Sequence, residues 1–141
     1  TNRNSDRQKA LASRLLGPVK QVLDSGLEAL NREHLALIKA SDDAHDLECK
    51  AAADRLAEAY EASRLEHDQV SQSYRNGGTT PFQRREALDA WYARRQAAEV
   101  ARDAELNAAW KLRAAEGVAI LCAWQDAVEA HLDLWEKAFP A

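Results

Sequence analysis

Apolar side chains recur every three or four positions along most of this chain, which is the spacing of one helix face. The clearest stripe steps by four, three, four, four, three and four positions: Gly117, Leu121, Trp124, Val128, Leu132, Trp135 and Phe139. A matching stripe lies early in the chain: Leu23, Leu27, Leu30, His34 and Leu37 or Ile38. We expect the two stripes to face each other, with Trp124, Leu132 and Trp135 in the core.

Glycine and proline divide the chain into three helical pieces. The pair Gly17-Pro18 ends a short helix that opens with a capping box, Ser5 to Gln8. This helix places Leu11, Leu15 and Leu16 on one edge. A second capping box, Thr80 to Gln83, follows the glycine-rich break and carries Pro81 in its first turn. We therefore expect helices over about residues 6–16, 19–75 and 81–139, with a turn at residues 76–80.

The two long pieces have nearly equal length, so a short turn between them makes them antiparallel neighbours. Folding about Gly78 puts residue i beside residue 155 − i, and each helix would be roughly 85–90 Å long. The sequence predicts a single all-α domain over residues 1–141, a long coiled-coil-like hairpin with the short helix at its base. The alternative is a four-helix bundle, which would need both long helices to break, near residues 41–46 and at Gly117.

Near the turn the predicted seam between the long helices is thinner. One side of it reads Cys49, Ala52, Leu56, Ala59 or Tyr60, Ser63, His67, Val70 and Tyr74. The facing side reads Leu88, Trp91 or Tyr92, Arg95, Ala98, Arg102, Leu106 and Ala109. Small residues let two helices approach closely, as in an alanine-rich antiparallel coiled coil.

Charge favours the same register. Residues 24–74 carry a net charge of −7 and residues 75–113 a net charge of +3. Residues 1–23 carry +4 and residues 114–141 carry −4. The antiparallel arrangement places each basic block beside an acidic one, whereas other pairings would bring like charges together.

Composition narrows the choice of fold and function. Alanine fills 29 positions while Val, Ile and Thr together fill 11, which suits helix and disfavours sheet. No apolar window is long enough to cross a membrane, and no signal peptide is visible. The net charge of −4 argues against a dedicated nucleic-acid binder.

The source and location follow from composition alone. Two cysteines suggest a reducing compartment, so we expect a cytoplasmic protein, or a virion protein if the source is a phage. The excess of 13 Arg over 6 Lys, with abundant Ala, favours a bacterial or phage source. Thr1 is small enough to follow a removed initiator Met, so we expect a complete chain.

Candidate chemistry is sparse. The residues Asp42, His45, Asp46 and Cys49 share one helix face and could ligate a metal. A carboxylate-bridged di-iron bundle needs a second Glu-x-x-His copy that is missing here, so we favour a solvated acidic turn with His45 near Trp110. We expect His34, His67 and His131 to be packing residues. The chain has no catalytic constellation and no phosphate loop, so we expect no enzyme activity, no cofactor and no metal.

The predicted function is that of a non-enzymatic structural or adaptor protein that joins a larger assembly or associates with itself. Ile120 and Leu134 flank the main stripe, and the short helix covers only part of that region. We expect both residues at a contact between chains or under the N-terminal helix. The candidate partner-binding residues are Ile120, Leu134, Trp135, Tyr74, Phe82, Arg84 and Arg85.

The turn offers a second interpretation. Its basic and aromatic residues, Tyr74, Arg75, Phe82, Arg84 and Arg85, could bind an anionic membrane surface. We favour a simpler arrangement in which the two aromatic rings close the loop. The arginines would then pair with Glu66, Asp68 and Glu86.

Overall fold

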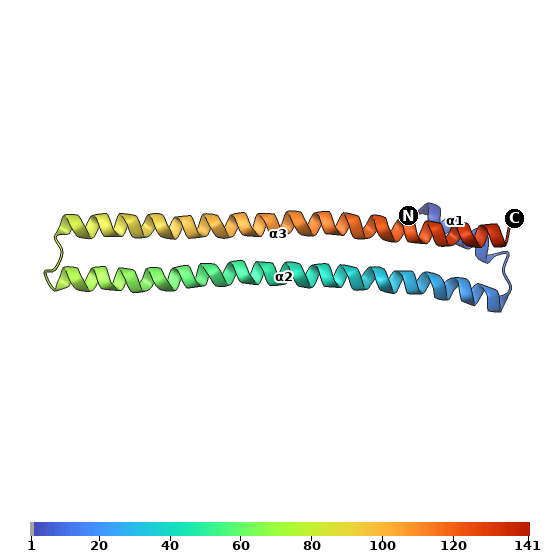
Figure 1. Ribbon diagram of the computed structural model, residues 1–141, viewed down its shortest axis with the longest axis horizontal. Coiled ribbons are helices and arrows are strands. Elements are labelled where there is room, and N and C mark those ends of the chain that lie inside the picture. Colours follow the sequence, from blue (N-terminus) through green and yellow to red (C-terminus); the bar gives the residue numbers. More distant parts are fainter. Residues whose placement is uncertain (1) are drawn as a thin grey trace. The chain divides into compact units, whose positions relative to one another are not determined.

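The protein is all-α. A computed structural model describes residues 2–141, so Thr1, the residue expected after a removed initiator Met, lies outside the described part. The described chain forms α1 (Asn2–Ala12), α2 (Gly17–Arg75) and α3 (Pro81–Ala138), with no strand among these residues (Figure 1). Abundant alanine and the lack of internal proline account for such long helices.

The two long helices have no internal break. α2 passes through residues 41–46 and α3 passes through Gly117 as regular helix, so the breaks required by the four-helix alternative are not present. Local contacts explain the continuity of α2. The Ser41 hydroxyl donates to Glu116 at 2.6 Å instead of competing for its own backbone, and Lys39 pairs with Asp43 one turn later at 2.8 Å.

The start of the chain differs from the expected pattern. α1 begins at Asn2, so Ser5 lies inside the helix and the expected capping box is wrong. α1 also ends at Ala12, where the Ser13 hydroxyl donates to the Ala10 carbonyl at 2.7 Å. Gly17 is the first residue of α2, and Gly77 is the described glycine with a positive φ, of 75°. Pro18 suits the first turn of α2, which is why Gly17 belongs to that helix.

The chain forms two compact units, each of which we describe by itself. The terminal unit comprises residues 1–43 and 113–141, and the turn unit comprises residues 44–112. In the terminal unit α1 packs on both long helices through a core of four aliphatic residues: Leu11, Leu23, Val128 and Leu132. Leu11, Leu23 and Leu132 are completely buried, and half-buried Trp124 and Trp135 pack against the same core.

Ionic contacts fix the orientation of α1. The Arg7 guanidinium lies 2.9 Å from Glu136 and also contacts Asp133. Arg14 donates to the Phe139 carbonyl at 2.8 Å. The basic start of the chain therefore pairs with its acidic end, as the charge blocks predict. The pKa of Glu136 is lowered, chiefly by its hydrogen bond with Arg7.

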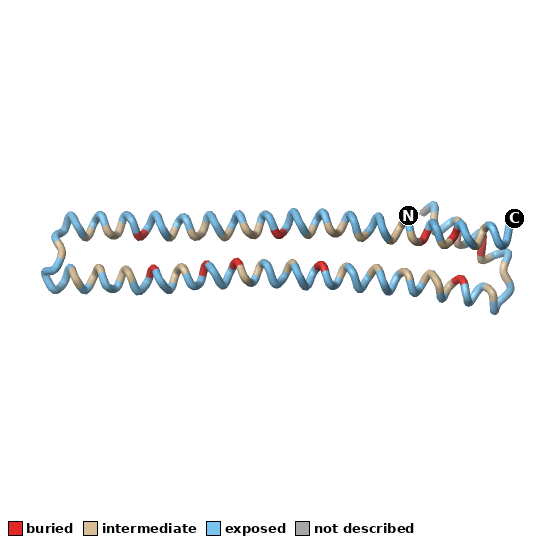
Figure 2. Tube along the Cα trace, in the orientation of Figure 1, coloured by how far each residue is buried: buried red, intermediate tan, exposed pale blue. Residues whose placement is uncertain are grey.

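In the turn unit, residues 44–75 of α2 and 81–112 of α3 lie antiparallel. The buried residues of this unit are Ala52, Leu56 and Ser63 on α2 and Trp91 and Ala109 on α3. Buried positions lie on the sides of the two helices that face each other (Figure 2). This agrees with the predicted seam and chooses Trp91 over the exposed Tyr92. The Trp91 Nε1 donates to the Ser63 carbonyl at 2.6 Å, close to the predicted pairing of residue 63 with residue 92.

The turn at residues 76–80 is closed by the predicted capping box. Gln83 N donates to the Thr80 hydroxyl at 3.2 Å, and Thr80 N donates to the Gln83 side chain at 2.9 Å. Both halves of the box are therefore formed. This confirms the predicted start of α3.

Polar contacts link the two helices of the turn unit. Arg55 pairs with Glu105, and Arg94 pairs with Glu66. Only the second pair has its basic residue on α3, as the charge blocks predict. Tyr60 donates a hydrogen bond to Glu99, which raises the pKa of the Tyr60 hydroxyl.

Candidate functional site

All four histidines lie against a tryptophan. The pairs and their ring-centre distances are His34–Trp124 at 4.9 Å, His45–Trp110 at 4.3 Å, His67–Trp91 at 5.1 Å and His131–Trp135 at 6.3 Å. The prediction that His34, His67 and His131 are packing residues is confirmed, as is the proximity of His45 to Trp110. Trp110 itself is exposed.

The candidate metal ligands do not converge. Asp42 pairs with Arg113 at 2.6 Å. His45 Nδ1 faces the Ala109 carbonyl at 3.3 Å, while its Nε2 lies 3.5 Å from the Cys49 sulfur. Within residues 2–141 no three His, Cys, Asp or Glu side chains form a group that could hold a metal ion.

The two residues expected at a chain contact lie in different surroundings. Ile120 is half-buried and lines a cavity of about 170 Å³ with α2 residues that include Leu30 and His34. No residue of α1 lines this cavity, so Ile120 does not lie under α1 there, and its contact with another chain stays a prediction. Leu134 is 67% exposed and is not covered by α1. Trp135, the third candidate, is half-buried and stacks on Phe139 with 5.5 Å between ring centres.

Leu121 takes the outward position that we expected for Ile120. It is 44% exposed, although the stripe placed it in the core. Each residue advances about 100° around a helix, so Ile120 and Leu121 lie about 40° and 60° to either side of Trp124. The packing of α3 on α2 selects Ile120 as the inner residue.

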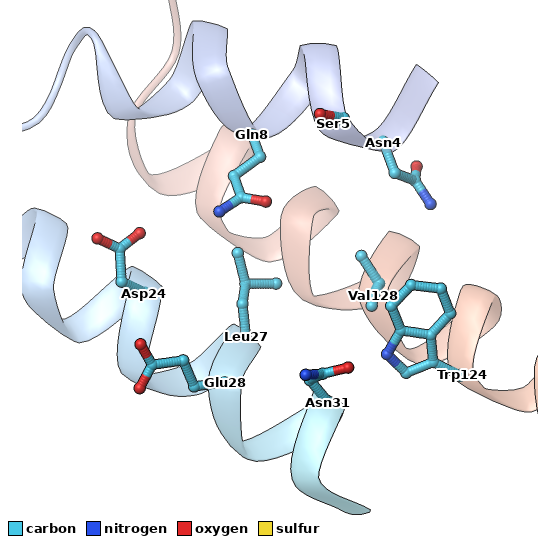
Figure 3. Close-up of a pocket in the computed structure, with 9 residues that line it drawn as sticks. All are labelled: Asn4, Ser5, Gln8, Asp24, Leu27, Glu28, Asn31, Trp124 and Val128. Atoms are coloured by element: carbon cyan, nitrogen blue, oxygen red, sulfur yellow. The ribbon is translucent and has the colours of Figure 1, made fainter. Parts of the chain in front are cut away.

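The main pocket of the terminal unit lies where α1 begins. It has a volume of about 530 Å³ and nine lining residues: Asn4, Ser5, Gln8, Asp24, Leu27, Glu28, Asn31, Trp124 and Val128 (Figure 3). Its floor is apolar, with Leu27 and Val128 facing each other between α2 and α3. Its rim is polar and includes two carboxylates. Concave sites with an apolar floor and a few polar groups are typical binding sites.

Exposed apolar residues continue the line of this pocket away from α1. On α2 the pocket residues Asp24, Glu28 and Asn31 are followed at helical spacing by Leu35, which is 54% exposed. On α3, Leu121 lies two turns before the pocket residue Val128 and is also exposed. We call the pocket together with Leu35 and Leu121 the α1-end groove, after the N-terminal end of α1.

The carboxylates of the α1-end groove form no ion pair within the described chain. Neither Asp24 nor Glu28 has an ion-pair partner among residues 3–141, whereas Asp133 and Glu136 on the other side of α1 both pair with Arg7. They lie one turn apart on α2. Lys20 lies one turn before Asp24 and Arg32 lies one turn after Glu28, so basic residues flank the two carboxylates along the helix.

The turn presents the basic and aromatic residues as a surface. Phe82 is 69% exposed, so it does not close the loop, and that expectation is wrong. The Arg84 guanidinium lies 4.9 Å from the centre of the Tyr74 ring. This contact is a cation–π interaction between half-buried Arg84 and exposed Tyr74. Arg75 and Arg85 are exposed.

The carboxylates expected to neutralise the turn are engaged elsewhere. Glu66 pairs with Arg94, and Asp68 pairs with Arg64 at 3.2 Å. In the described chain no ion pair joins Arg75, Arg84 or Arg85 to Glu66, Asp68 or Glu86, so that expectation is wrong. Asp68 pairs with Arg64 rather than with an arginine of the turn, because a spacing of four residues places the two side chains on neighbouring turns of one helix.

Sequence reasoning missed the α1-end groove. The residues at positions 24, 28, 31 and 35 lie on one face of α2 and change from acidic through uncharged polar to apolar. This pattern indicates a binding surface only once the position of the start of α1 is known. No helix within residues 2–141 has a stretch long and apolar enough to cross a membrane. Comparisons with protein-family models, curated proteins and solved structures found no match to this chain.

Proposed function

We propose that this chain is a non-enzymatic structural or adaptor protein that joins a larger assembly by docking on another protein. The observation that carries the proposal is the α1-end groove, in which a pocket lined by α1, α2 and α3 is continued by the exposed apolar residues Leu35 and Leu121. A groove of this kind, rimmed by polar residues, is typical of a protein-binding surface.

The proposal includes a long hairpin as the scaffold. It rests on the complementary charge blocks and on the continuity of α2 and α3, which run for 59 and 58 residues. Small-angle scattering of a monomer should then give a maximum dimension of roughly 90 Å. A compact particle of about 50–60 Å would contradict the hairpin and favour a bundle.

The docking function is tested by affinity capture from the native host with matched variants. Leu121→Asp should abolish capture of the partner, because it places a charge in the α1-end groove. Leu134→Asp should retain capture, because this residue is more exposed than Leu121 and lies outside the groove. Both variants should keep the parent helicity by circular dichroism. Equal capture of the partner by the parent and by Leu121→Asp would show that the α1-end groove is not the docking surface.

An alternative function is favoured by the turn surface. Exposed Phe82, the cation–π pair of Arg84 with Tyr74 and the two exposed arginines form a basic-aromatic patch suited to an anionic membrane. If the patch has this function, the protein should float with phosphatidylserine-containing vesicles at low salt but not with neutral ones.

The triple variant Arg75→Gln, Arg84→Gln, Arg85→Gln should lose this flotation. A matched variant with the same change in net charge, Lys9→Gln, Lys20→Gln, Lys137→Gln, should keep it, because these exposed lysines have no ion-pair partner in the described chain and lie outside the turn. Absence of flotation by the parent protein would reject the membrane function and leave the docking function as proposed.

A further inference from the structure

We propose that the main pocket of the terminal unit binds a neutral sugar of one or two rings. The pocket lies between the first half of α1 and the two long helices and has a volume of about 530 Å³ (Figure 3). Small-molecule sites usually measure about 300–1,000 Å³. Sugar binding goes beyond the proposed docking function, because the ligand is held among three helices and does not contact exposed Leu35 or Leu121.

The polar side chains of the pocket have unused hydrogen-bonding capacity. Six of them line it, and none forms a hydrogen bond with another residue among residues 3–141. They come from two helices: Asn4, Ser5 and Gln8 from α1, and Asp24, Glu28 and Asn31 from α2. Asn4, Gln8 and Asp24 are half-buried. Polar groups that are withdrawn from water are normally hydrogen-bonded, so their convergence on one hollow indicates a ligand site.

The chemistry of these side chains determines the functional groups of the ligand. The carboxylates of Asp24 and Glu28 accept hydrogen bonds and cannot donate them, so the ligand must carry donors. The amides of the Asn and Gln residues and the Ser5 hydroxyl both donate and accept. A hydroxyl group of the ligand also does both. A molecule with several hydroxyl groups therefore matches the whole polar lining.

The charge around the pocket favours a neutral ligand. Asp24 and Glu28 would repel an anion. Lys20 and Arg32 flank this acidic pair, each one turn away along α2, so the pair does not require a cation from the ligand. The other polar residues of the lining are uncharged. These conditions are met by a neutral sugar.

The apolar part of the pocket fits the ring of a sugar. Leu27 and Val128 face each other, Trp124 lies beside Val128, and Gln8 extends from α1 toward Leu27 (Figure 3). The C–H groups on one face of a sugar ring can pack on this aliphatic and aromatic surface, while the hydroxyls at its edge reach the polar side chains. Trp124 stacks on His34 with 4.9 Å between ring centres, so its ring is held in place before a ligand binds.

The test is titration calorimetry of the full chain with four neutral sugars: glucose, N-acetylglucosamine, maltose and lactose. We expect saturable binding of at least one of them. Spermidine, a cation without hydroxyl groups, is the comparison probe and should not bind in the pocket. Circular dichroism of each variant checks that the fold is kept.

The variant Gln8→Ala, Asp24→Ala removes two half-buried polar groups from two helices of the pocket. It should weaken sugar binding about tenfold, a loss of about 1.4 kcal/mol. Neither side chain has a hydrogen-bond partner in the described chain, so the fold should not depend on them. The control variant Gln21→Ala, Asp126→Ala changes the same residue types at exposed positions outside the pocket and should bind as the parent does.

Three results would overturn the proposed sugar site. The first is no saturable binding of any of the four sugars. The second is equal affinity of the pocket variant and the control variant, which would place the sugar outside the pocket. The third is binding of spermidine without binding of a sugar, which would make the ligand a cation. Leu121→Asp should bind the sugar as the parent does, since Leu121 does not line the pocket, so the sugar site and the docking function can fail separately.

Discussion

The terminal unit and the turn unit use the same two helices but bury their large side chains to different extents. The terminal unit has a third helix, and three of its leucines are completely buried. The turn unit has two helices, and its buried residues include small and polar ones such as Ala52 and Ser63. The third helix completes the burial, because the largest buried side chains of the turn unit, Leu56 and Trp91, keep 8% of their surface exposed.

The turn unit compensates with directional contacts. Trp91 donates to a carbonyl of the other helix, Tyr60 donates to Glu99, and the Arg95 guanidinium lies 4.3 Å from the centre of the Tyr60 ring. These contacts fix the register of two helices whose seam is rich in alanine. In the terminal unit the equivalent role falls to aliphatic packing, and the groove appears where that packing stops.

Truncation of the aliphatic core should have the largest effect on stability. Leu132→Ala removes a completely buried side chain between three helices and should lower the free energy of unfolding by roughly 2–5 kcal/mol. Leu134→Ala, two positions later and 67% exposed, should change it by less than about 0.5 kcal/mol. Urea unfolding followed by circular dichroism measures both. A similar loss in the two variants would mean that α1 does not cover this core.

The directional contacts of the turn unit should have a smaller effect. Trp91→Phe removes a buried hydrogen bond to Ser63 and part of the ring, which should lower the free energy of unfolding by about 1–2 kcal/mol. Trp110→Phe in the same unit changes an exposed ring and should be nearly neutral. Equal stability of the two variants in urea would contradict the role assigned to Trp91.

The docking of α1 should depend on pH. Arg7 holds the pKa of Glu136 below its ordinary value of 4.5, so the stabilisation is fully present above that value. It is lost as the pH falls below 4.5 and through the lowered pKa of the folded state. Hydrogen exchange at the α1 amides should therefore accelerate over this range, relative to amides of the turn unit. Arg7→Gln should accelerate α1 exchange at neutral pH and remove the pH dependence that Glu136 causes.

Much of the turn unit could be predicted because its signals are local. The capping box at Thr80, the seam of small residues and the pairing of residue 63 with the region of residue 92 depend on spacing along one helix and on the length of one turn. Sequence could not choose between Trp91 and Tyr92, because neighbours in sequence flank the same seam. The carbonyl of Ser63 on the other helix makes that choice.

The terminal unit was less predictable because three helices meet there. Ile120 and Leu121 are equally apolar and lie on either side of Trp124, so only the position of α2 distinguishes them. The groove depends on where α1 begins along two other helices, and the capping box at Ser5 to Gln8 predicted a later start than Asn2. Pairing of the basic start with the acidic end was predictable, since charge blocks do not require an accurate boundary.

The smallest expected effects compare one glycine from each unit. Gly77 in the turn unit has a φ of 75°, a conformation that costs a residue with a side chain about 1 kcal/mol. Gly77→Ala should therefore lower the free energy of unfolding by about that amount.

Gly17 is the first residue of α2 in the terminal unit, and an added methyl group would meet no atom within 4 Å. Gly17→Ala should be neutral or should stabilise the protein by a few tenths of a kcal/mol, because alanine restricts the unfolded chain. Thermal unfolding of the two variants beside the parent distinguishes these outcomes. Destabilisation by Gly17→Ala that matches that of Gly77→Ala would contradict the open surroundings of Gly17.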